Sequence, residues 1–197
     1  MLKAENITKS FGDLTVLDGF SYDFPKGACT VIMGASGCGK STLLSVLMGT
    51  LAPDSGTITR EYSKISAVFQ ENRLCENLSA LSNLRLVLGK SKSRGELINE
   101  LAAVGLADAA DKPARSLSGG MKRRVALLRA LLAEYDVLFL DEPFKGLDEE
   151  TKRTVMEYTR ERTAGKTVIL VTHDKTEAEY FGGNTLSLPL SQGSQDI

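Results

Sequence analysis

Residues 34–42 read GASGCGKST, and this stretch decides how the rest of the chain is interpreted. It lies between an apolar run at 28–33, ACTVIM, and a leucine-rich run at 43–48, LLSVLM. Glycine costs backbone entropy, so the glycines in the stretch indicate a main chain that must stay bare. The spacing G-x-x-x-x-G-K-[ST] is typical of a phosphate-binding loop between a strand and a helix. The stretch therefore predicts that backbone N–H groups and a helix N-terminus bind nucleotide phosphates.

Two side chains of this loop have separate expected tasks. Lys40 is expected to reach the β and γ phosphates, and the Ser41 hydroxyl is expected to ligate Mg²⁺. The loop indicates nucleotide binding, but it does not say which reaction the nucleotide serves.

Length and composition are those of an ordinary globular protein. The chain has 197 residues, of which 42% are hydrophobic and 25% charged, enough for one domain with a buried core. The formal net charge of −1 gives no reason to expect a nucleic-acid partner. Cys29, Cys38 and Cys75 lack the spacing of a metal site and are typical of reduced thiols in a cytosolic protein. No apolar segment indicates a signal peptide or a membrane-spanning helix.

Strand and helix patterns alternate along the chain and predict an α/β sheet with right-handed crossovers. Strands are expected at 20–24, 28–33, 57–62, 65–69, 137–140 and 167–171. Helices are expected at 40–48, where Gly49 suits the stop position, and at 125–132, 148–163 and 175–180. Residues 70–135, with leucines at helical spacing from 78 to 106, are interpreted as a helical insert, and 191–197 as a disordered tail.

Polar residues follow three of the predicted strands. Ligands of α/β sheets bind at the carboxyl ends of the strands, so these residues are expected on the same rim as Lys40. Asp141 could hold Mg²⁺ through water, and Glu142 could polarise a water for attack on the γ-phosphate. The lone histidine, His173, and the amide of Gln70 end two other strands, within expected reach of phosphate, Mg²⁺ or water. Taken singly, each of these residues could also be an ordinary loop or surface residue.

The segment Leu117-Ser118-Gly119-Gly120-Met121 is unusual for a helix start. Ser118 is a good N-cap, yet two glycines weaken the first turn of the helix that follows. Bare N–H groups at a helix start form an anion site. The segment therefore predicts a second phosphate-binding site. A dimer that shares nucleotides across its interface would need such a site, whereas one chain binding one nucleotide would not.

In order and spacing, these motifs resemble the nucleotide-binding domain of ATP-binding cassette (ABC) transporters, from about residue 2 to about residue 185. The matching phosphate loop comprises Gly34, Ala35, Ser36, Gly37, Cys38, Gly39, Lys40, Ser41 and Thr42. The other matching motifs are Gln70 of the Q-loop, Ser118, Gly119 and Gly120 of the signature, Asp141 and Glu142 after the Walker B strand, Asp148 of the D-loop and the switch histidine His173. Phe11, which by position alone suggests a strand-end core residue, falls where the family stacks an aromatic ring on adenine.

The resemblance implies a phosphate-loop NTPase fold with a mixed or parallel sheet, an N-terminal antiparallel β subdomain and an inserted helical subdomain, all in one domain over 1–197. Two copies would enclose two ATP molecules, each with Mg²⁺. Ser118 and Gly120 of one copy would contact the γ-phosphate held at Lys40 of the other. Hydrolysis would drive transmembrane permease subunits from the inner face of the membrane. The stretch 69–78 looks most like importers of the nitrate, sulfonate and taurine type.

Some features depart from this pattern or leave alternatives open. Met121 replaces the usual glutamine of the signature and cannot hydrogen-bond as an amide does. Residues 122–124, KRR, suggest a solvated helix face more than a nucleic-acid site. The alternatives are an ABC-type ATPase not coupled to transport, an inactive nucleotide-binding module, and a phosphotransferase, which would not need the Ser-Gly-Gly signature.

Overall fold

The computed structural model describes residues 1–188, and these fall into two compact units. The first unit contains residues 1–65, 135–141 and the segment that begins at Gly165. The second contains residues 66–134 and 142–164. The chain therefore passes between the units at several points, and one of these lies between Asp141 and Glu142. The tail predicted for 191–197 lies outside the described residues.

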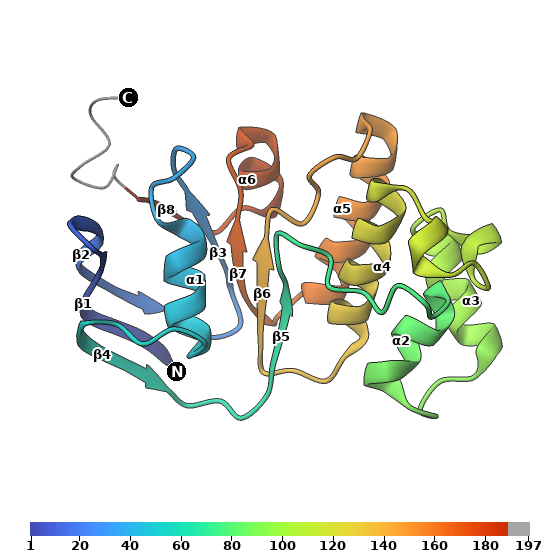
Figure 1. Ribbon diagram of the computed structural model, residues 1–197, viewed down its shortest axis with the longest axis horizontal. Coiled ribbons are helices and arrows are strands. Elements are labelled where there is room, and N and C mark those ends of the chain that lie inside the picture. Colours follow the sequence, from blue (N-terminus) through green and yellow to red (C-terminus); the bar gives the residue numbers. More distant parts are fainter. Residues whose placement is uncertain (189–197) are drawn as a thin grey trace. The chain divides into compact units, whose positions relative to one another are not determined.

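An antiparallel sheet forms the N-terminal part of the first unit (Figure 1). Its strands, in the spatial order β2-β1-β4, are β2 (Leu14–Phe24), β1 (Leu2–Phe11) and β4 (Ser55–Arg60). Leu2, Ala4 and Ile7 of β1 are buried, while Glu5 and Asn6 are exposed. This burial of one face is what an antiparallel sheet covering a core requires. Strand β4 begins two residues before the predicted range 57–62.

A parallel sheet forms the centre of the first unit. Four of its strands pair in the order β6-β7-β3-β8, namely β6 (Val137–Asp141), β7 (Thr167–Val171), β3 (Cys29–Met33) and β8 (Asn184–Ser187). Every residue of β6 and β7 is buried, as expected for near-continuous apolar runs in a sheet covered on both faces. The sequence pattern does not indicate β8, because this short strand has mostly exposed side chains and no apolar alternation.

Among the described residues, the first unit has two helices, α1 (Lys40–Met48) and α6 (Lys175–Phe181). The predicted bounds of α1 are confirmed, and Gly49 ends the helix in the left-handed region at φ 80°. Helix α1 contacts β6, and α6 contacts β3. Because parallel strands share one direction, the residues after Met33, Asp141 and Val171 all follow carboxyl ends at the same edge of the sheet.

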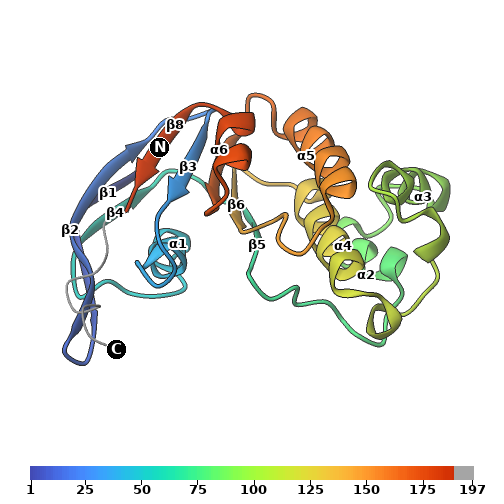
Figure 2. The same cartoon turned by 90° about the horizontal axis from the view of Figure 1, so that it is seen from above.

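The second unit is mainly helical. Strand β5 (Ile65–Val68) leads into it, and its helices are α2 (Ala80–Leu88), α3 (Arg94–Ala103), α4 (Gly119–Leu132) and α5 (Glu149–Thr163), with 3₁₀ turns at Ala107–Ala109 and Ala114–Ser116. The leucine pattern at 78–106 forms two helices, because Ser93 caps α3 with a capping box that includes Glu96. Helices α4 and α5 run side by side in Figure 1 and Figure 2. Among residues 1–188, no helix is long and apolar enough to cross a bilayer.

Candidate functional site

The phosphate loop connects β3 to α1 in the first unit. Gly39 is the N-cap of α1 and lies in the left-handed region at φ 95°. A Cβ at Gly39 would lie 2.6 Å from Cγ1 of Val16 and 3.0 Å from its carbonyl oxygen. Both the conformation and the close approach of β2 therefore require glycine here. The helix start presents N–H groups without a capping side chain, which is what a phosphate-binding helix start needs.

The Lys40 ammonium is held inside this loop. Its side chain is largely buried, and Nζ donates hydrogen bonds to the carbonyl oxygens of Gly34 at 2.8 Å and Ala35 at 2.7 Å. These contacts keep the positive charge next to the N-terminus of α1. A buried ammonium and a helix N-terminus at one point both favour an anion there.

Ser41 and Asp141 meet between α1 and β6. The Ser41 hydroxyl donates to Oδ2 of Asp141 at 2.8 Å, although the residues are 100 positions apart. Hydroxyl and carboxylate oxygens fit Mg²⁺, which binds through one or two such groups together with phosphate oxygens. Within residues 1–188 no group of three or more His, Cys, Asp or Glu side chains could hold a metal by itself. The chemistry of the Ser41 and Asp141 oxygens therefore fits part of a Mg²⁺ site.

His173 lies in a short, well-braced loop after β7. Its side chain is exposed. On one side, the Thr172 hydroxyl donates to Oε2 of buried Glu177 at 2.6 Å and accepts from the Asp174 backbone N–H at 3.1 Å. On the other side, Asp174 caps α6 by accepting from the N–H groups of Thr176 and Glu177. These bonds hold the backbone of the loop and leave the imidazole facing outward.

Phe11 ends β1 with its ring in the open. The side chain is 51% exposed, so the interpretation as a core residue at a strand end is wrong. The Lys9 ammonium lies 5.6 Å from the centroid of the ring. An exposed aromatic ring next to a cation offers a stacking surface to a flat ligand.

In the second unit, Ser118 is the N-cap of α4. Its hydroxyl accepts from the backbone N–H of Met121 at 3.3 Å. That bond uses the main chain of Met121, so the missing amide side chain does not weaken the cap. A Cβ at Gly120 would approach the Gly146 carbonyl and Leu147 to 3.3 Å each, which brings the signature segment close to the loop before α5. Gly119 is the first residue of α4, and a Cβ added there would have no atom within 4 Å.

Glu142 has an uncommon backbone. Its φ is 45°, in the left-handed region that non-glycine residues rarely adopt. The carboxylate is half-buried, and its Oε2 lies 2.9 Å from the Lys145 ammonium. Strain of this kind persists only where surrounding contacts determine it, and it is found most often at functional sites.

The two other predicted residues of the second unit differ in role. Gln70 follows β5 with an exposed side chain. Asp148 is the N-cap of α5, where Oδ1 accepts from the Thr151 backbone N–H at 3.0 Å. This hydrogen bond lowers the pKa of the Asp148 carboxyl, so its negative charge stands at the N-terminus of α5.

Sequence reasoning missed Arg123. The run 122–124 is interpreted above as a solvated face, and this is wrong for Arg123, which is only 4% exposed. Its guanidinium donates to the carbonyl oxygens of Phe69, Glu142 and Pro143. Lys122 does reach the surface, where it pairs with Glu76 at 2.9 Å. The apolar neighbours at 125–128 place this part of α4 inside the unit, but they do not show which basic residue turns inward.

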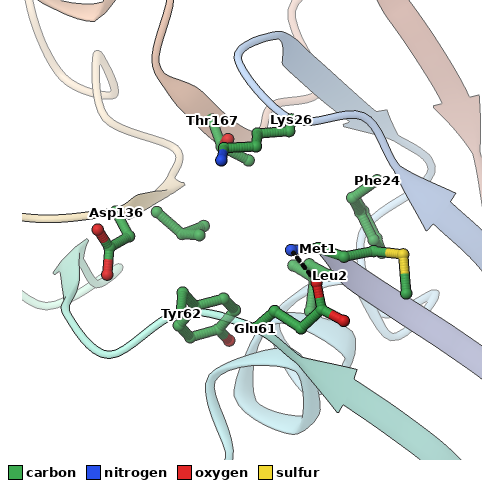
Figure 3. Close-up of a pocket in the computed structure, with 9 residues that line it drawn as sticks. Met1, Leu2, Phe24, Lys26, Glu61, Tyr62, Asp136 and Thr167 are labelled. Carbon is green, nitrogen blue, oxygen red and sulfur yellow. Dashed lines mark hydrogen bonds and ion pairs between the residues drawn. The ribbon is translucent and has the colours of Figure 1, made fainter.

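A small pocket lies at the other end of the parallel sheet (Figure 3). It has a volume of about 40 Å³ and is lined by the first residues of β6 and β7, Val137 and Thr167. The N-terminal ammonium of Met1 lies 3.4 Å from Oε2 of Glu61 at this pocket (Figure 3). This pocket itself has room for about one water molecule, and it lies at the end of the sheet opposite the phosphate loop.

The comparisons with known proteins agree with the geometry of the phosphate loop. The profile of the family described as "ABC transporter" matches residues 17–145, from β2 to the loop after β6. The chain belongs to the ABC transporter family. The resemblance predicted from the motifs is confirmed, and this chain is an ATP-binding, ATP-hydrolysing cassette subunit of that family.

Several ABC transporter proteins with assigned roles are similar to this chain. An aliphatic sulfonates import ATP-binding protein of Mesorhizobium japonicum is 42% identical over 88% of this chain and 70% of its own length. A sulfonates import protein of Rhodopseudomonas palustris is 39% identical over the whole chain and 73% of its own length. A Nod factor export ATP-binding protein of Ralstonia nicotianae is 34% identical over 91% of this chain and 61% of its own length.

Solved structures of ABC cassettes confirm the predicted fold class. The dimeric structure of MJ0796, a bacterial ABC transporter cassette, matches with a TM-score of 0.85 and 30% identity over 95% of this chain and 94% of that one. A post-hydrolysis state of the same cassette, bound to ADP and Pi, matches with a TM-score of 0.84. These relatives support a transport ATPase and not the alternative of an ABC-type ATPase uncoupled from transport.

Proposed function

We propose that this ABC transporter subunit dimerises around two ATP molecules and uses their hydrolysis to drive permease subunits that import a small organic anion of the sulfonate type. The observation that carries the proposal is the contact between Ser41 and Asp141, next to the buried Lys40 ammonium. Together they supply a cation for phosphate and an oxygen pair for Mg²⁺, both at the end of the parallel sheet where ligands bind.

The first unit supplies the nucleotide cradle. The loop of Gly34, Ala35, Ser36, Gly37, Cys38, Gly39, Lys40, Ser41 and Thr42 surrounds the phosphates, with its backbone N–H groups and the Lys40 ammonium donating to phosphate oxygens. The exposed ring of Phe11 stacks on the adenine. These N–H groups and the Lys40 ammonium would also stabilise the negative charge that develops on the γ-phosphate during its transfer.

Mg²⁺ is the proposed metal of this cradle. By the roles that their motifs imply, the Ser41 hydroxyl, the Asp141 carboxylate (through water) and the Gln70 amide oxygen would hold it. Bound Mg²⁺ would supply positive charge that neutralises the phosphates. Asp141, buried at the end of β6, keeps the Ser41 hydroxyl oriented by the bond at 2.8 Å.

Glu142 is the proposed general base. Its carboxylate takes a proton from a water whose oxygen attacks the γ-phosphorus, while the bond from that phosphorus to the β-phosphate bridging oxygen breaks. The products are ADP and inorganic phosphate, and the proton is released later. The outward-facing His173 imidazole contacts the γ-phosphate and senses its departure.

The second copy completes each site. Ser118, Gly119 and Gly120 of the partner subunit present bare N–H groups of the α4 start to the γ-phosphate, and Asp148 contributes from the start of α5. Ser118 and Gly119 are exposed, which leaves this helix start accessible to another copy. Structures of a similar cassette are dimeric, and one holds ADP and Pi.

Permease contact is assigned to the second unit, residues 70–135 being the helical insert of a single ABC ATPase domain over 1–197. Leu86 and Val87 of α2 are 55% and 47% exposed, and Leu78 is also exposed. Exposed apolar side chains that gather on one element mark protein interaction surfaces. A subunit with this contact would lie in the cytoplasm, peripheral on the inner face of the membrane, and this is the proposed location. No nucleic-acid partner is proposed.

Affinity purification from detergent-solubilised native membranes tests the proposal. The tagged chain is expected to recover a multi-spanning membrane protein, and the Leu86→Ser/Val87→Ser double variant is expected to recover far less of it. A matched variant, Ala102→Ser/Ala103→Ser on exposed positions of α3, should recover as much as the parent. In vesicles, the ATPase of the complex should rise with an alkanesulfonate. Recovery of ribosomes in place of a membrane protein would overturn the transport assignment.

A further inference from the structure

Arg123 is a buried arginine in the second turn of α4. It lies five positions after the N-cap Ser118, and its side chain is 4% exposed. A guanidinium carries five N–H donors and remains charged, so burial is tolerated only where acceptors surround it. The positions of these acceptors therefore indicate which segments of the chain the Arg123 side chain connects.

The guanidinium bridges two loops of the second unit. Nη1 donates to the Phe69 carbonyl oxygen, the last one before Gln70. Nη2 donates to the carbonyl oxygen of Glu142 at 2.6 Å, and Nε donates to that of Pro143 at 3.2 Å. One planar side chain therefore joins the signature helix, the segment before Gln70 and the peptide of the proposed base.

We propose that Arg123 is a positioning residue for Glu142, so that the base is aligned for water attack only while this guanidinium holds its carbonyl group. The inference rests on the proposed function of Glu142. The left-handed φ of 45° at Glu142 belongs to a sparsely populated region and needs contacts that determine it. The bond to the Glu142 carbonyl fixes the peptide on one side of the residue, and with it the direction in which the carboxylate leaves the backbone.

The fork shape of the guanidinium is essential to this role. Nη2 and Nε donate to consecutive carbonyl oxygens of Glu142 and Pro143, while Nη1 points to the other loop. A lysine at 123 would keep the charge, but its single ammonium could not serve both loops in fixed directions. Arg123→Lys therefore keeps a buried positive charge but loses the directed hydrogen bonds to the two loops.

A merely structural arginine would behave differently. If Arg123 only satisfied carbonyl groups in the interior of the unit, its replacement would lower thermal stability and leave the chemistry of the folded fraction unchanged. If it positions Glu142, the folded variant would bind ATP normally and hydrolyse it slowly, because only the alignment of the base changes.

The test compares Arg123→Lys with Arg129→Lys in the full chain. Arg129 lies on the same helix, and its Nη2 donates to the carbonyl oxygens of Asn72 at 3.4 Å and Arg73 at 2.9 Å, in a different loop from Glu142 and Pro143. For Arg123→Lys, kcat is expected to fall about 10- to 100-fold, the loss typical of a misplaced catalytic group. The KM for ATP should change by less than about threefold. Arg129→Lys should retain kcat within about threefold of the parent.

A second measurement distinguishes loss of Glu142 positioning from general damage to the structure of the unit. Single-turnover hydrolysis is compared in Glu142→Gln and in Glu142→Gln/Arg123→Lys. Because Arg123 acts through the Glu142 carboxylate, the second change should have no further effect once that carboxylate is gone. Additive losses, or a kcat for Arg123→Lys equal to that of Arg129→Lys, would overturn the inference.

The outcomes also distinguish this inference from the proposed function. Undiminished hydrolysis by Glu142→Gln would remove Glu142 as the base, and the role of Arg123 would be lost with it. Hydrolysis that depends on Glu142 but not on Arg123 would overturn the positioning role alone. Thermal unfolding of each variant confirms that the rates refer to folded protein.

Discussion

The hydroxyl of Ser41 donates a hydrogen bond of 2.8 Å to Oδ2 of Asp141, which joins the first turn of α1 to the last residue of β6. The two residues lie on elements that are distant in sequence and in contact in space. Their oxygens are the groups proposed to act on Mg²⁺, and the contact lies at the end of the sheet where α/β proteins bind their ligands.

Replacing Asp141 by asparagine should weaken the binding of ATP only when Mg²⁺ is present. Asparagine keeps the shape of the side chain but removes the charge that orients Ser41 and attracts the metal. The loss of affinity in Mg²⁺ is expected to be about 10-fold or more, the range for partners that orient metal ligands. Isothermal titration with ATP, in Mg²⁺ and in EDTA, measures the effect.

Asp136→Asn is the matched control. Asp136 precedes the same strand at its other end, where Oδ2 accepts from the backbone N–H groups of Ser63 and Lys64. This change should leave the Mg²⁺ dependence of binding as it is in the parent. If both substitutions reduced the Mg²⁺-dependent affinity for ATP equally, the assignment of Asp141 to the metal site would be wrong.

Lys40→Ala should abolish measurable ATP binding. The ammonium is buried in the phosphate loop, so the variant loses a charge-assisted contact in a site of low dielectric. Binding is measured with a fluorescent ATP analogue, and the exposed Lys26 serves as the control in Lys26→Ala. Tight binding retained by Lys40→Ala would remove the loop from the proposed function.

Glu142→Gln should trap an ATP-bound dimer. The amide cannot accept the proton of the attacking water, so ATP persists and holds the two copies together. Light scattering should show the mass double when ATP and Mg²⁺ are added, and ADP should not cause this change. The surface variant Glu161→Gln should hydrolyse ATP as the parent does. A monomeric Glu142→Gln at high protein and ATP concentrations would contradict the shared site.

Glu100 should make the stability of the chain depend on pH. Its Oε2 accepts from Tyr158 and from Arg162 at 2.6 Å each, and its Oε1 accepts from Lys92 at 3.1 Å. Burial alone would raise the pKa of Glu100, but the bonds from Tyr158 and Lys92 and the charge of Arg162 outweigh it and lower the pKa. A carboxyl with a lowered pKa stabilises the fold above its unfolded pKa and loses this contribution as the pH falls through its folded pKa.

Glu100→Gln is therefore expected to reduce the free energy of unfolding by about 2 kcal/mol at pH 7, since the partners Lys92 and Arg162 reach solvent and can be rehydrated. The difference from the parent should shrink as the pH falls below the ordinary range of a glutamate pKa and through the lowered pKa of folded Glu100. Urea unfolding followed by circular dichroism measures both values. The exposed Glu157→Gln on α5 should change stability little, and a pH-independent loss in Glu100→Gln would contradict the account.

Much of the fold can be predicted from local patterns. The apolar runs at 137–140 and 167–171 form the buried strands β6 and β7, because only strands covered on both faces tolerate such continuous hydrophobicity. The helix at 40–48 has the predicted bounds because glycines flank it on both sides. The short strand β8 could not be predicted, since its pairing with β3 depends on a neighbour far away in sequence.

The candidate site divides in the same way. Three motifs could be recognised from the sequence alone: the phosphate loop, the acids after β6 and the Ser118 cap. Each is a short local segment, and its residue types and spacing indicate its chemistry. The burial of Arg123 could not be read from the run 122–124, because one turn of a helix presents adjacent basic residues in different directions. The exposure of Phe11 likewise depends on how the end of β1 turns into β2.

The amino-acid sequence by itself determined the family, the phosphate loop and the order of the motifs, because these are local in the chain and depend on residue type and spacing. Only the tertiary structure decided that Ser41 meets Asp141 and that Arg123 holds the carbonyl of Glu142. Such contacts join residues distant in sequence, and they depend on the register of strands and the facing of helices, which packing of the whole unit sets.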